Sequence, residues 1–302
     1  MMRVFLATEA GVPPFILTKH TIGLSVRPAR SGDLDEVRRV IEASRHVHLQ
    51  LDWWTLEDWI DNPGFLVAQS NQHIVGMGLG VRDAAAVAWL RALVAEDGLD
   101  TGRLLSALLP PMLAALRSQG IQAMNCMAWL KWLEMKLPEH GFFPLARVVT
   151  LRKDDMAAPI PLAGKAVLRE ANSADLDAVV AIDHAAFEPD WWYGQAIFFR
   201  AMRGAIRFIV AERDSQTVGY AFAHMNSSQA HVTRLAVHPS YQGQGIGALL
   251  MADLIEYSRA HGADAMTLNT QTYNQNSLRL YHRLGFIETD TAVTMFRRSV
   301  NE

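Results

Sequence analysis

Gln242-Gly243-Gln244-Gly245-Ile246-Gly247 lies between a strand-like run, Val232 to Val237, and a helix-like run that begins near Ile246. Glycines let the backbone turn tightly so that its N–H groups converge, and the following helix adds the positive end of its dipole. Such a turn can hold an anionic pyrophosphate with main-chain groups alone. A second interpretation stays open, because many strand-to-helix turns contain glycine for steric reasons only.

Two familiar phosphate-binding turns do not fit this stretch. It has no Gly-Lys-Ser/Thr ending for a P-loop, and no suitably placed acidic residue follows a second strand for a dinucleotide fold. The longer segment from Arg234 to Gly247 resembles instead the coenzyme A signature of the GNAT N-acyltransferase superfamily, Gln/Arg-x-x-Gly-x-Gly/Ala after a strand. Gln242, Gly245 and Gly247 fill the positions of that signature.

A second segment, Asn274 to Phe286, resembles the next signature of the superfamily, Asn-x-x-Ala/Ser-x-x-x-Tyr-x-x-x-Gly-Phe. The resemblance covers roughly residues 167–298. It implies acetyl-CoA as the cosubstrate and a mixed, mostly antiparallel sheet flanked by helices. The two central strands of such a sheet splay apart to admit the pantetheine arm.

The chain also resembles itself at an offset of about 143 residues. Three landmarks recur in the same order: Val26 to Asp35 and Leu168 to Asp177, Arg91 to Val94 and Arg234 to Val237, and His140 to Phe142 and Leu284 to Phe286. The alternative is that any two α/β domains share such patterns. We predict an α/β (α+β) chain of two tandem GNAT-like domains that pack as an intrachain pseudo-dimer.

The repeat sets the expected boundaries. Residues 1–21 form an N-terminal extension, 22–153 a degenerate first domain, and 165–302 the catalytic domain, with a linker rich in Pro and Ala at 154–164. In the second domain we expect helices at 174–187, 192–203, 246–261 and 275–284. Strands are expected at 166–171, 206–213, 217–226, 230–238 and 264–269, followed by two closing strands that end near 298.

The first copy has lost the residues of the signatures. Its loop, Leu99 to Leu104, keeps one glycine and adds Asp100, whose carboxylate would repel phosphate. Leu137 takes the place of Tyr281 and cannot donate a proton. We therefore expect one acetyl-CoA site per chain, and we interpret the first copy as a structural or acceptor-shaping partner.

The resemblance assigns the cofactor contacts in the second copy. The strand before the loop would hold the acyl and pantetheine groups with its main chain, the loop would hold the pyrophosphate, and the next helix would border the pantetheine and adenosine. The residues are Leu235, Ala236, Val237, Gln242, Gly243, Gln244, Gly245, Ile246, Gly247, Ala248, Asn274 and Ser277.

Tyr281 stands at the tyrosine position of the superfamily and is the candidate acid for the leaving thiolate, with a packing tyrosine as the alternative. Many members carry a Glu base on the strand before the loop, but Thr233 occupies that position here. His231, on the same strand face, is the candidate base, although a lone histidine is often structural. An acceptor amine that deprotonates readily would need no base.

The segment Phe187 to Tyr193 links the first two helices of the second copy, a link that overlies the acceptor site in the superfamily. Phe187, Asp190, Trp191 and Trp192 are the candidate acceptor residues, because acidic and aromatic side chains together suit a cationic amine. The alternative is that these aromatic residues pack the two copies together.

Composition excludes several classes of protein. Half of the 302 residues are hydrophobic and 20% are charged, which excludes extensive disorder, and a net charge of −3 gives no reason to expect nucleic-acid binding. Cys126 is the only cysteine, so neither an intrachain disulfide nor a thiolate metal cluster is expected. We expect no metal, membrane span or signal peptide, a cytoplasmic location, and a monomer or weak dimer.

These observations lead to one principal hypothesis and two alternatives. The chain is expected to transfer an acetyl group from acetyl-CoA to a primary amine of a small molecule or a peptide N-terminus, by direct attack in the C-terminal domain. A non-catalytic acyl-CoA-binding sensor is the first alternative, favoured by the absent Glu. A partner-binding scaffold without a ligand is the second, and the intact glycine loop counts against it.

Overall fold

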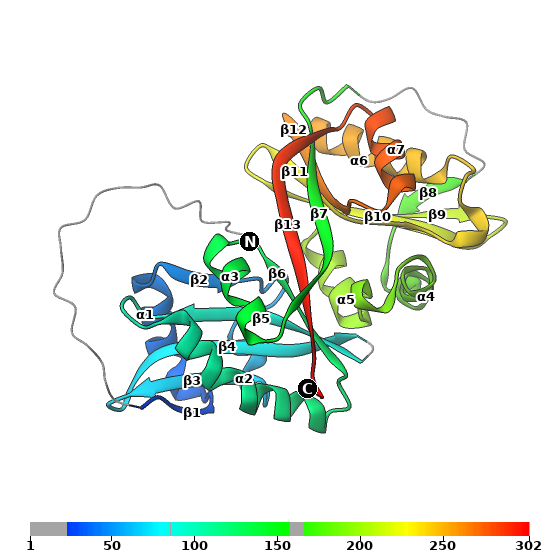
Figure 1. Cartoon of the computed structure of the whole chain (residues 1–302). Coiled ribbons are helices and arrows are strands. Elements are labelled where there is room, and N and C mark those ends of the chain that lie inside the picture. The colour runs from blue at the N-terminus through cyan, green and yellow to red at the C-terminus, as the bar shows by residue number, and fades with distance from the viewer. Residues whose placement is uncertain (1–22, 85, 158–165, 302) are drawn as a thin grey trace. The chain divides into compact units, whose positions relative to one another are not determined.

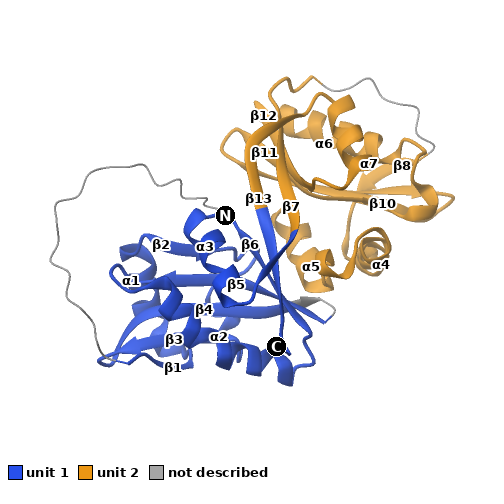
Figure 2. Cartoon of the chain, viewed as in Figure 1, with its two compact units in different colours: residues 1–145, 294–302 blue, residues 146–293 orange. Residues whose placement is uncertain are grey.

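A computed structural model describes residues 23–84, 86–157 and 166–301 of the chain (Figure 1). The expected extension at 1–21 and the part of the linker from 158 to 164 lie outside the described residues. The chain divides into two compact units (Figure 2), residues 1–145 with 294–302 and residues 146–293. None of the helices in the described ranges is long and apolar enough to cross a lipid bilayer.

Unit 1 is built on an apolar sheet with helices on both faces. Its elements are β1 (Ser25–Pro28), α1 (Leu34–Ala43), β2 (His46–Leu49), β3 (Phe65–Ser70), β4 (His73–Ala84), β5 (Val87–Ala95), α2 (Thr101–Ser118), β6 (Ala123–Ala128) and α3 (Lys131–Lys136). The strand order is β1-β3-β4-β5-β6, and β2 pairs with β5. Every residue of β5 is buried, which places this strand at the centre of the core.

Unit 2 has the expected order of helices and strands. Its elements are β8 (Val167–Glu170), α4 (Leu176–Ala186), α5 (Gln195–Gly204), β9 (Arg207–Arg213), β10 (Gln216–Asn226), β11 (Gln229–Val237), α6 (Ile246–Ala260), β12 (Ala265–Gln271) and α7 (Gln275–Arg283). The order β8-β9-β10-β11-β12 is antiparallel except for the parallel pair β11–β12. Helices α4 and α5 cover one face, and α6 and α7 cover the other (Figure 1). The predicted mixed, mostly antiparallel sheet is confirmed.

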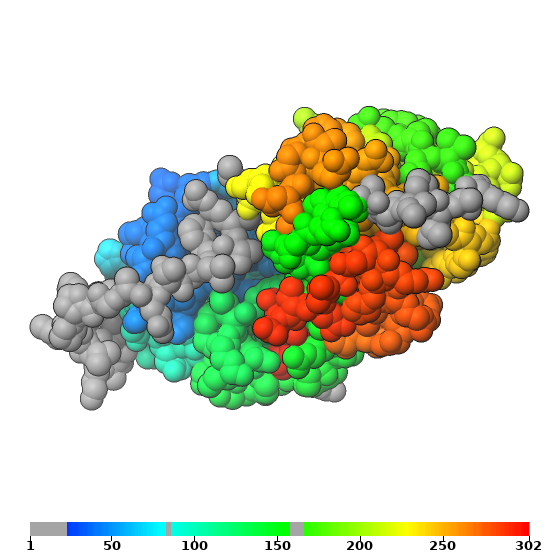
Figure 3. Space-filling model, turned by 90° about the horizontal axis from the view of Figure 1, so that it is seen from above, coloured from blue at the N-terminus to red at the C-terminus, as the bar shows by residue number. Residues whose placement is uncertain are grey.

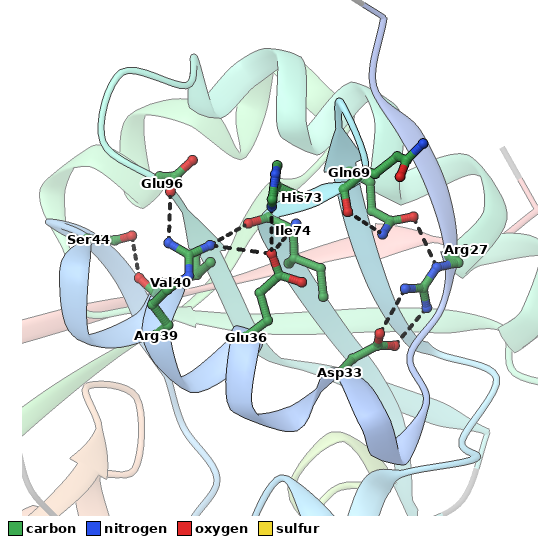
Figure 4. Close-up of polar contacts among 11 residues, drawn as sticks. Arg27, Asp33, Glu36, Arg39, Val40, Ser44, Gln69, His73, Ile74 and Glu96 are labelled. Atoms are coloured by element: carbon green, nitrogen blue, oxygen red, sulfur yellow. Dashed lines mark hydrogen bonds and ion pairs between the residues drawn. The ribbon is translucent and has the colours of Figure 1, made fainter.

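Each unit contains an Arg–Asp contact at the corresponding position of its repeat. In unit 1 the Arg27 guanidinium donates to both carboxylate oxygens of Asp33, at 2.7 and 2.8 Å, and to the side chain of Gln69 (Figure 4). In unit 2 the corresponding Arg169 donates to both oxygens of Asp175, at 2.8 and 2.7 Å, and to Glu212. Each arginine lowers the pKa of its aspartate by hydrogen bonding, so both contacts keep their charge.

The two repeats exchange their last strands. Strand β7 (Phe143–Lys153) closes the first repeat in sequence, but its residues 148–153 pair with β12 in unit 2. Strand β13 (Ile287–Ser299) ends the second repeat, and its residues 294–299 pair with β6 in unit 1. The unit boundaries therefore depart from the repeat boundaries by one strand at each end.

The two closing strands expected before residue 298 are one continuous strand, β13. The prediction of two strands was wrong because β13 runs through Ile287–Ser299 without a turn and serves both units. Within unit 2 the hydroxyl of Thr289 donates to the carbonyl of Thr150 in β7, at 3.1 Å. Figure 3 shows these neighbouring segments, green for β7 and red for β13, at the surface of the molecule.

Candidate active site

Strands β11 and β12 of unit 2 pair at one end and then separate. Their register joins residues 229–232 to residues 265–268, while β11 continues to Val237 and β12 to Gln271. The expected splay between the central strands is thus present, and we call the segments 233–237 and 269–271 the splay. The backbone groups of β11 in the splay that point away from β10 have no β12 partner in the described chain. Apart from the Val237 carbonyl, which accepts from the side chain of Gln242, they are available to a ligand with amide groups.

The glycine loop joins the splay to α6. Gln242 anchors it by donating from Nε2 to the carbonyl of Val237 at 3.0 Å, and the side chain of Gln244 contacts that of Arg213. Gly243 and Gly245 have φ of +74° and +81°, a conformation that L side chains rarely adopt, with open space where a Cβ would lie. Among the described residues no side chain caps the N-terminus of α6. Its N–H groups fit an anionic phosphate.

Gly247 serves a different purpose from the other two glycines. A Cβ at this position would meet the side chain of Leu280 in α7 at 3.3 Å and those of Leu235 and Val237 in β11 at 3.8 and 3.9 Å. The glycine therefore lets α6 approach α7 and β11 closely. Ile246 and Ala248 on either side are both buried.

Helix α7 carries the other predicted group. The side chain of Asn274 accepts from the backbone N–H of Ser277 at 3.2 Å and so caps the helix. Tyr281 is 7% exposed, and its ring meets that of Phe286 edge-on at 6.1 Å. Burial raises the pKa of Tyr281 to about 12, although a hydrogen bond with Ser277 opposes the shift, so the hydroxyl keeps its proton at neutral pH.

An open pocket of about 330 Å³ lies where α4 and β12 end. Two predicted acceptor residues line it, Phe187 and Trp191, and the indole N–H of Trp191 donates to the hydroxyl of Tyr273 at 3.2 Å. Burial raises the pKa of Tyr273, and the charges of Glu188 and Asp190 raise it further. The remaining lining residues are Ala186, Glu188, Gln271, Asn274, Gln275 and Asn276.

Trp192 lies outside this lining. Its ring stacks on His184 at 4.2 Å, and its indole N–H donates to the carbonyl of Phe187 at 2.8 Å. The sequence pattern did not reveal Tyr273 or Glu188 as pocket residues. Tyr273 is 82 residues from Trp191, and its only signal was a position next to the Asn274 signature.

Arg234 fixes the pocket wall to β11. Its Nε donates to the carboxylate of Asp183, which is fully buried in α4, at 2.8 Å, and its Nη2 donates to the carbonyl of Trp191 at 2.5 Å. The guanidinium also lies 3.7 Å from the ring centre of Phe187. Removing one partner of a buried ion pair costs about 3–5 kcal/mol. This arginine served only as a repeat landmark in the sequence, yet it orders the pocket wall.

The candidate base lies deeper in the sheet than the splay. His231 is the register partner of Thr267 on β12, and its Nδ1 lies 2.9 Å from the Thr267 hydroxyl. Burial lowers the pKa of His231 to about 4, so the imidazole is neutral at neutral pH and a weaker base than an exposed histidine. Thr233, at the Glu position of the signature, lies two residues closer to the splay.

The corresponding region of unit 1 is filled. Strands β5 and β6 also separate, after residues 89 and 125, but β2 pairs with residues 92–95 of β5 on the edge that the separation frees. Asp100 caps α2 by accepting from the N–H of Arg103 at 2.7 Å, and Leu137 is fully buried. In this copy the protein's own chain occupies both the strand edge and the helix N-terminus.

A scan against family models agrees with this geometry. The acetyltransferase (GNAT) family matches residues 171–286, which include the splay, the glycine loop and α7. An uncharacterized N-acetyltransferase of Methanocaldococcus jannaschii is 31% identical over 121 residues, covering 40% of this chain and 77% of the relative. The chain belongs to the acetyltransferase (GNAT) family. Within the described ranges, no three His, Cys, Asp or Glu side chains come together as metal ligands.

Other relatives match over shorter parts of their own length. An uncharacterized protein of Mycobacterium leprae is 27% identical over 156 residues, 50% of this chain and 43% of that protein. The L-amino acid N-acyltransferase of Escherichia coli is 35% identical over 86 residues, 27% of this chain and 50% of that enzyme. The chain thus spans half or less of the length of these two relatives.

Solved structures extend the likeness to both copies. A tandem GNAT protein from the clavulanic acid biosynthesis pathway superposes with a TM-score of 0.64 at 16% identity, over 92% of this chain and 99% of that one. A GCN5-related N-acetyltransferase from Sphaerobacter thermophilus superposes with a TM-score of 0.63 at 14% identity, over 94% of this chain and 97% of that one. At these identities the likeness concerns the fold, which is a tandem of two GNAT domains.

Proposed function

We propose that unit 2 transfers an acetyl group from acetyl-CoA to a primary amine. The observation that carries the proposal is the N-terminus of α6, where Gly245 at the N-cap provides no side-chain cap, together with the nearby edge of β11 that has no β12 partner among the described residues. The first feature suits the pyrophosphate and the second suits the amides of pantetheine. When bound, acetyl-CoA would supply the activated acyl group.

Each group of this chain has a distinct task in the proposal. The N–H groups of residues 243–248 hold phosphate, and the main chain of residues 235–237 aligns the pantetheine and the acyl carbonyl. Asn274 and Ser277 border the same arm. The Tyr281 hydroxyl donates to the sulfur as the C–S bond breaks, and His231 accepts the amine proton directly or through water.

The pocket lined by Phe187, Trp191 and Tyr273 is the proposed acceptor site, and Asp190 and Trp192 belong to its wall segment. Its aromatic rings and the adjacent carboxylates of Glu188 and Asp190 suit a cationic amine of a small molecule or a peptide N-terminus. The acyltransferase from Escherichia coli that matches this chain acts on L-amino acids, so free amino acids are included among the candidate acceptors.

Two measurements test the proposal. Calorimetry measures binding of acetyl-CoA to the full chain, and an assay of CoA release then compares amines, polyamines, aminoglycosides, amino acids and peptides as acceptors. We expect one binding site and release with at least one amine. Two equivalent sites would contradict the assignment of the filled first copy. Binding without release across the panel would favour a non-catalytic acyl-CoA sensor, which the threonine at the Glu position already suggests.

A further inference from the structure

Thr233 occupies a bulge in β11 at the start of the splay. The register of β11 with β10 places Arg234 opposite Phe222 and Val232 opposite Ala223, so that Thr233 is an extra residue with no opposite partner. A bulge bends its strand and redirects side chains, and bulges are frequent beside active sites. Here the bulge directly follows Val232, the last β11 residue that pairs with β12.

The redirected hydroxyl contacts a histidine. Oγ1 of Thr233 lies 2.8 Å from Nδ1 of His224 on β10. His224 is on the α4 and α5 face, since its ring meets Phe222 edge-on at 5.9 Å and Phe222 in turn meets Phe198 of α5. A neutral imidazole with its proton on Nε2 accepts the hydroxyl proton at Nδ1, which leaves the oxygen lone pairs of Thr233 for another donor.

The electrostatics keep this histidine neutral. Burial lowers the pKa of His224 to about 4, and the nearby His231, its register partner on β11, lowers it further. The imidazole is therefore unprotonated above about pH 5, which leaves the lone pair of Nδ1 for the Thr233 hydroxyl.

The bulge also adjoins the acceptor pocket. Arg234 directly follows Thr233, stacks on Phe187 at 3.7 Å and donates to the carbonyl of Trp191. Phe187 and Trp191 line the pocket. Arg234 thus joins the residue at which the two strands diverge to the wall of the pocket.

We propose that Thr233 and His224, in place of His231, bind the acceptor amine and take its proton, an assignment that rests on the proposed acetyl transfer in unit 2. The acceptor first loses its ammonium proton to water, and Thr233 Oγ1 then accepts a hydrogen bond from the neutral amine as its nitrogen attacks the acyl carbon. As the N–C bond forms and the C–S bond breaks, the amine proton moves to Thr233 while the Thr233 proton moves to His224 Nδ1. The sulfur takes the Tyr281 proton. Once the product has left, the proton on His224 Nδ1 returns through Thr233 to water, and water returns one to Tyr281.

This pair differs from His231 in its access to the splay. The Nδ1 of His231 is engaged by Thr267, and both residues lie in the paired part of β11 and β12. Thr233 lies beyond that pairing, and its hydroxyl contacts His224 on β10, the strand on the other side of β11 from β12. Thr233 would touch the amine, and His224 would act through it.

Four variants of the full chain separate these roles, with kcat from CoA release and acetyl-CoA affinity from calorimetry. Thr233→Val removes the hydroxyl at constant shape and Thr233→Ser keeps it. His224→Asn keeps an acceptor near the Nδ1 position but cannot take a proton, and His231→Asn tests the other histidine. We expect Thr233→Val and His224→Asn to lower kcat by roughly ten- to a hundredfold while acetyl-CoA affinity stays unchanged. Thr233→Ser, which keeps the hydroxyl, should keep the kcat of the unaltered chain.

The dependence on the acceptor gives a second readout. The loss in Thr233→Val should be larger for an alkylamine, which must shed a firmly held proton, than for a weakly basic aromatic amine. If the role of Thr233 were merely structural, Thr233→Val would lower kcat equally with both amines, and His224→Asn would leave kcat unchanged.

The outcomes distinguish this inference from the proposed function. A wild-type chain that neither binds acetyl-CoA nor releases CoA overturns the proposed function and this assignment with it. An active wild type whose kcat falls in His231→Asn but not in Thr233→Val or His224→Asn overturns the Thr233–His224 assignment alone and leaves acetyl transfer standing.

Discussion

At the residue scale, Asp100 and Gly245 show how the two copies came to differ. Both residues precede a helix at the end of the central strand, and both occupy its N-cap position. The carboxylate of Asp100 caps the N-terminus of α2, because it accepts a hydrogen bond from the N–H of Arg103. Gly245 supplies no acceptor, so the helix dipole of α6 is left for an external anion.

The hydroxyl of Tyr281 is expected to act in chemistry and not in binding. Tyr281→Phe should lower turnover by roughly a hundredfold while acetyl-CoA affinity stays nearly unchanged, since the ring and its contact with Phe286 survive. Because the pKa of Tyr281 is raised to about 12, its proton is present throughout the neutral and mildly alkaline range. The rate of the unaltered enzyme should therefore show no alkaline decline from this group below about pH 10.

A matched control is Tyr257→Phe. Tyr257 lies on α6, where it stacks on His261 at 4.0 Å, away from the splay. Equal turnover in Tyr281→Phe and Tyr257→Phe would refute the acid role and leave the thiolate to depart unaided or with water. Steady-state kinetics with one working amine, from pH 6 to 10, suffices for the comparison.

At the scale of elements, the glycine loop and α6 act together as the proposed phosphate site. Gly245→Asp would place a carboxylate at the N-terminus of α6 and strain a backbone that has φ of +81°. We expect acetyl-CoA binding to weaken by more than about tenfold, the equivalent of 1.4 kcal/mol. Calorimetry on the full chain measures the change.

The chain provides a control that matches both the charge and the strain. Gly98 has φ of +93° and open space around it, and it precedes α2 in the filled copy. Gly98→Asp should cost similar folding stability without changing acetyl-CoA affinity. A loss of binding in Gly98→Asp but not in Gly245→Asp would reverse the roles of the two copies.

Most elements of unit 2 could be predicted because their patterns are local. The stripe of α6 is an example, since Leu250 and Leu254 lie one turn apart and both are fully buried. Strand β2 could not be predicted in this way, because the four residues His46–Leu49 become a strand only through pairing with β5. The exchange of β7 and β13 likewise depends on partners more than a hundred residues away.

The residues of the candidate site likewise fall into those with a local sequence signal and those that depend on long-range contacts. Gly243, Gly245 and Tyr281 are assigned from the two GNAT signatures that the sequence resembles, and each signature lies within one short segment. Thr233 gave no signal for its contact with His224, because the bulge appears only once β10 and β11 are in register. Long-range pairs of this kind need the fold before they can be found.

At the scale of the whole molecule, each unit depends on a strand from the other repeat. Residues 148–153 of β7 pair with residues 266–271 of β12, and residues 294–299 of β13 pair with β6. Backbone hydrogen bonds contribute about 1 kcal/mol each, and a domain has only about 5–15 kcal/mol of net stability. Losing one exchanged strand would therefore remove a large share of that stability.

Two fragments with different boundaries test this dependence. Residues 160–302 contain the second repeat but lack β7, so β12 would expose an unpaired edge and the end of β13 would have no partner. We expect this fragment to aggregate or to exchange strands into dimers, and to bind acetyl-CoA weakly. Residues 143–293 contain β7 and all of unit 2, and should form a monomer with cooperative thermal unfolding. Sedimentation, circular dichroism and calorimetry compare the two, and a monomeric, fully binding 160–302 fragment would show that unit 2 does not need the strand of the first repeat.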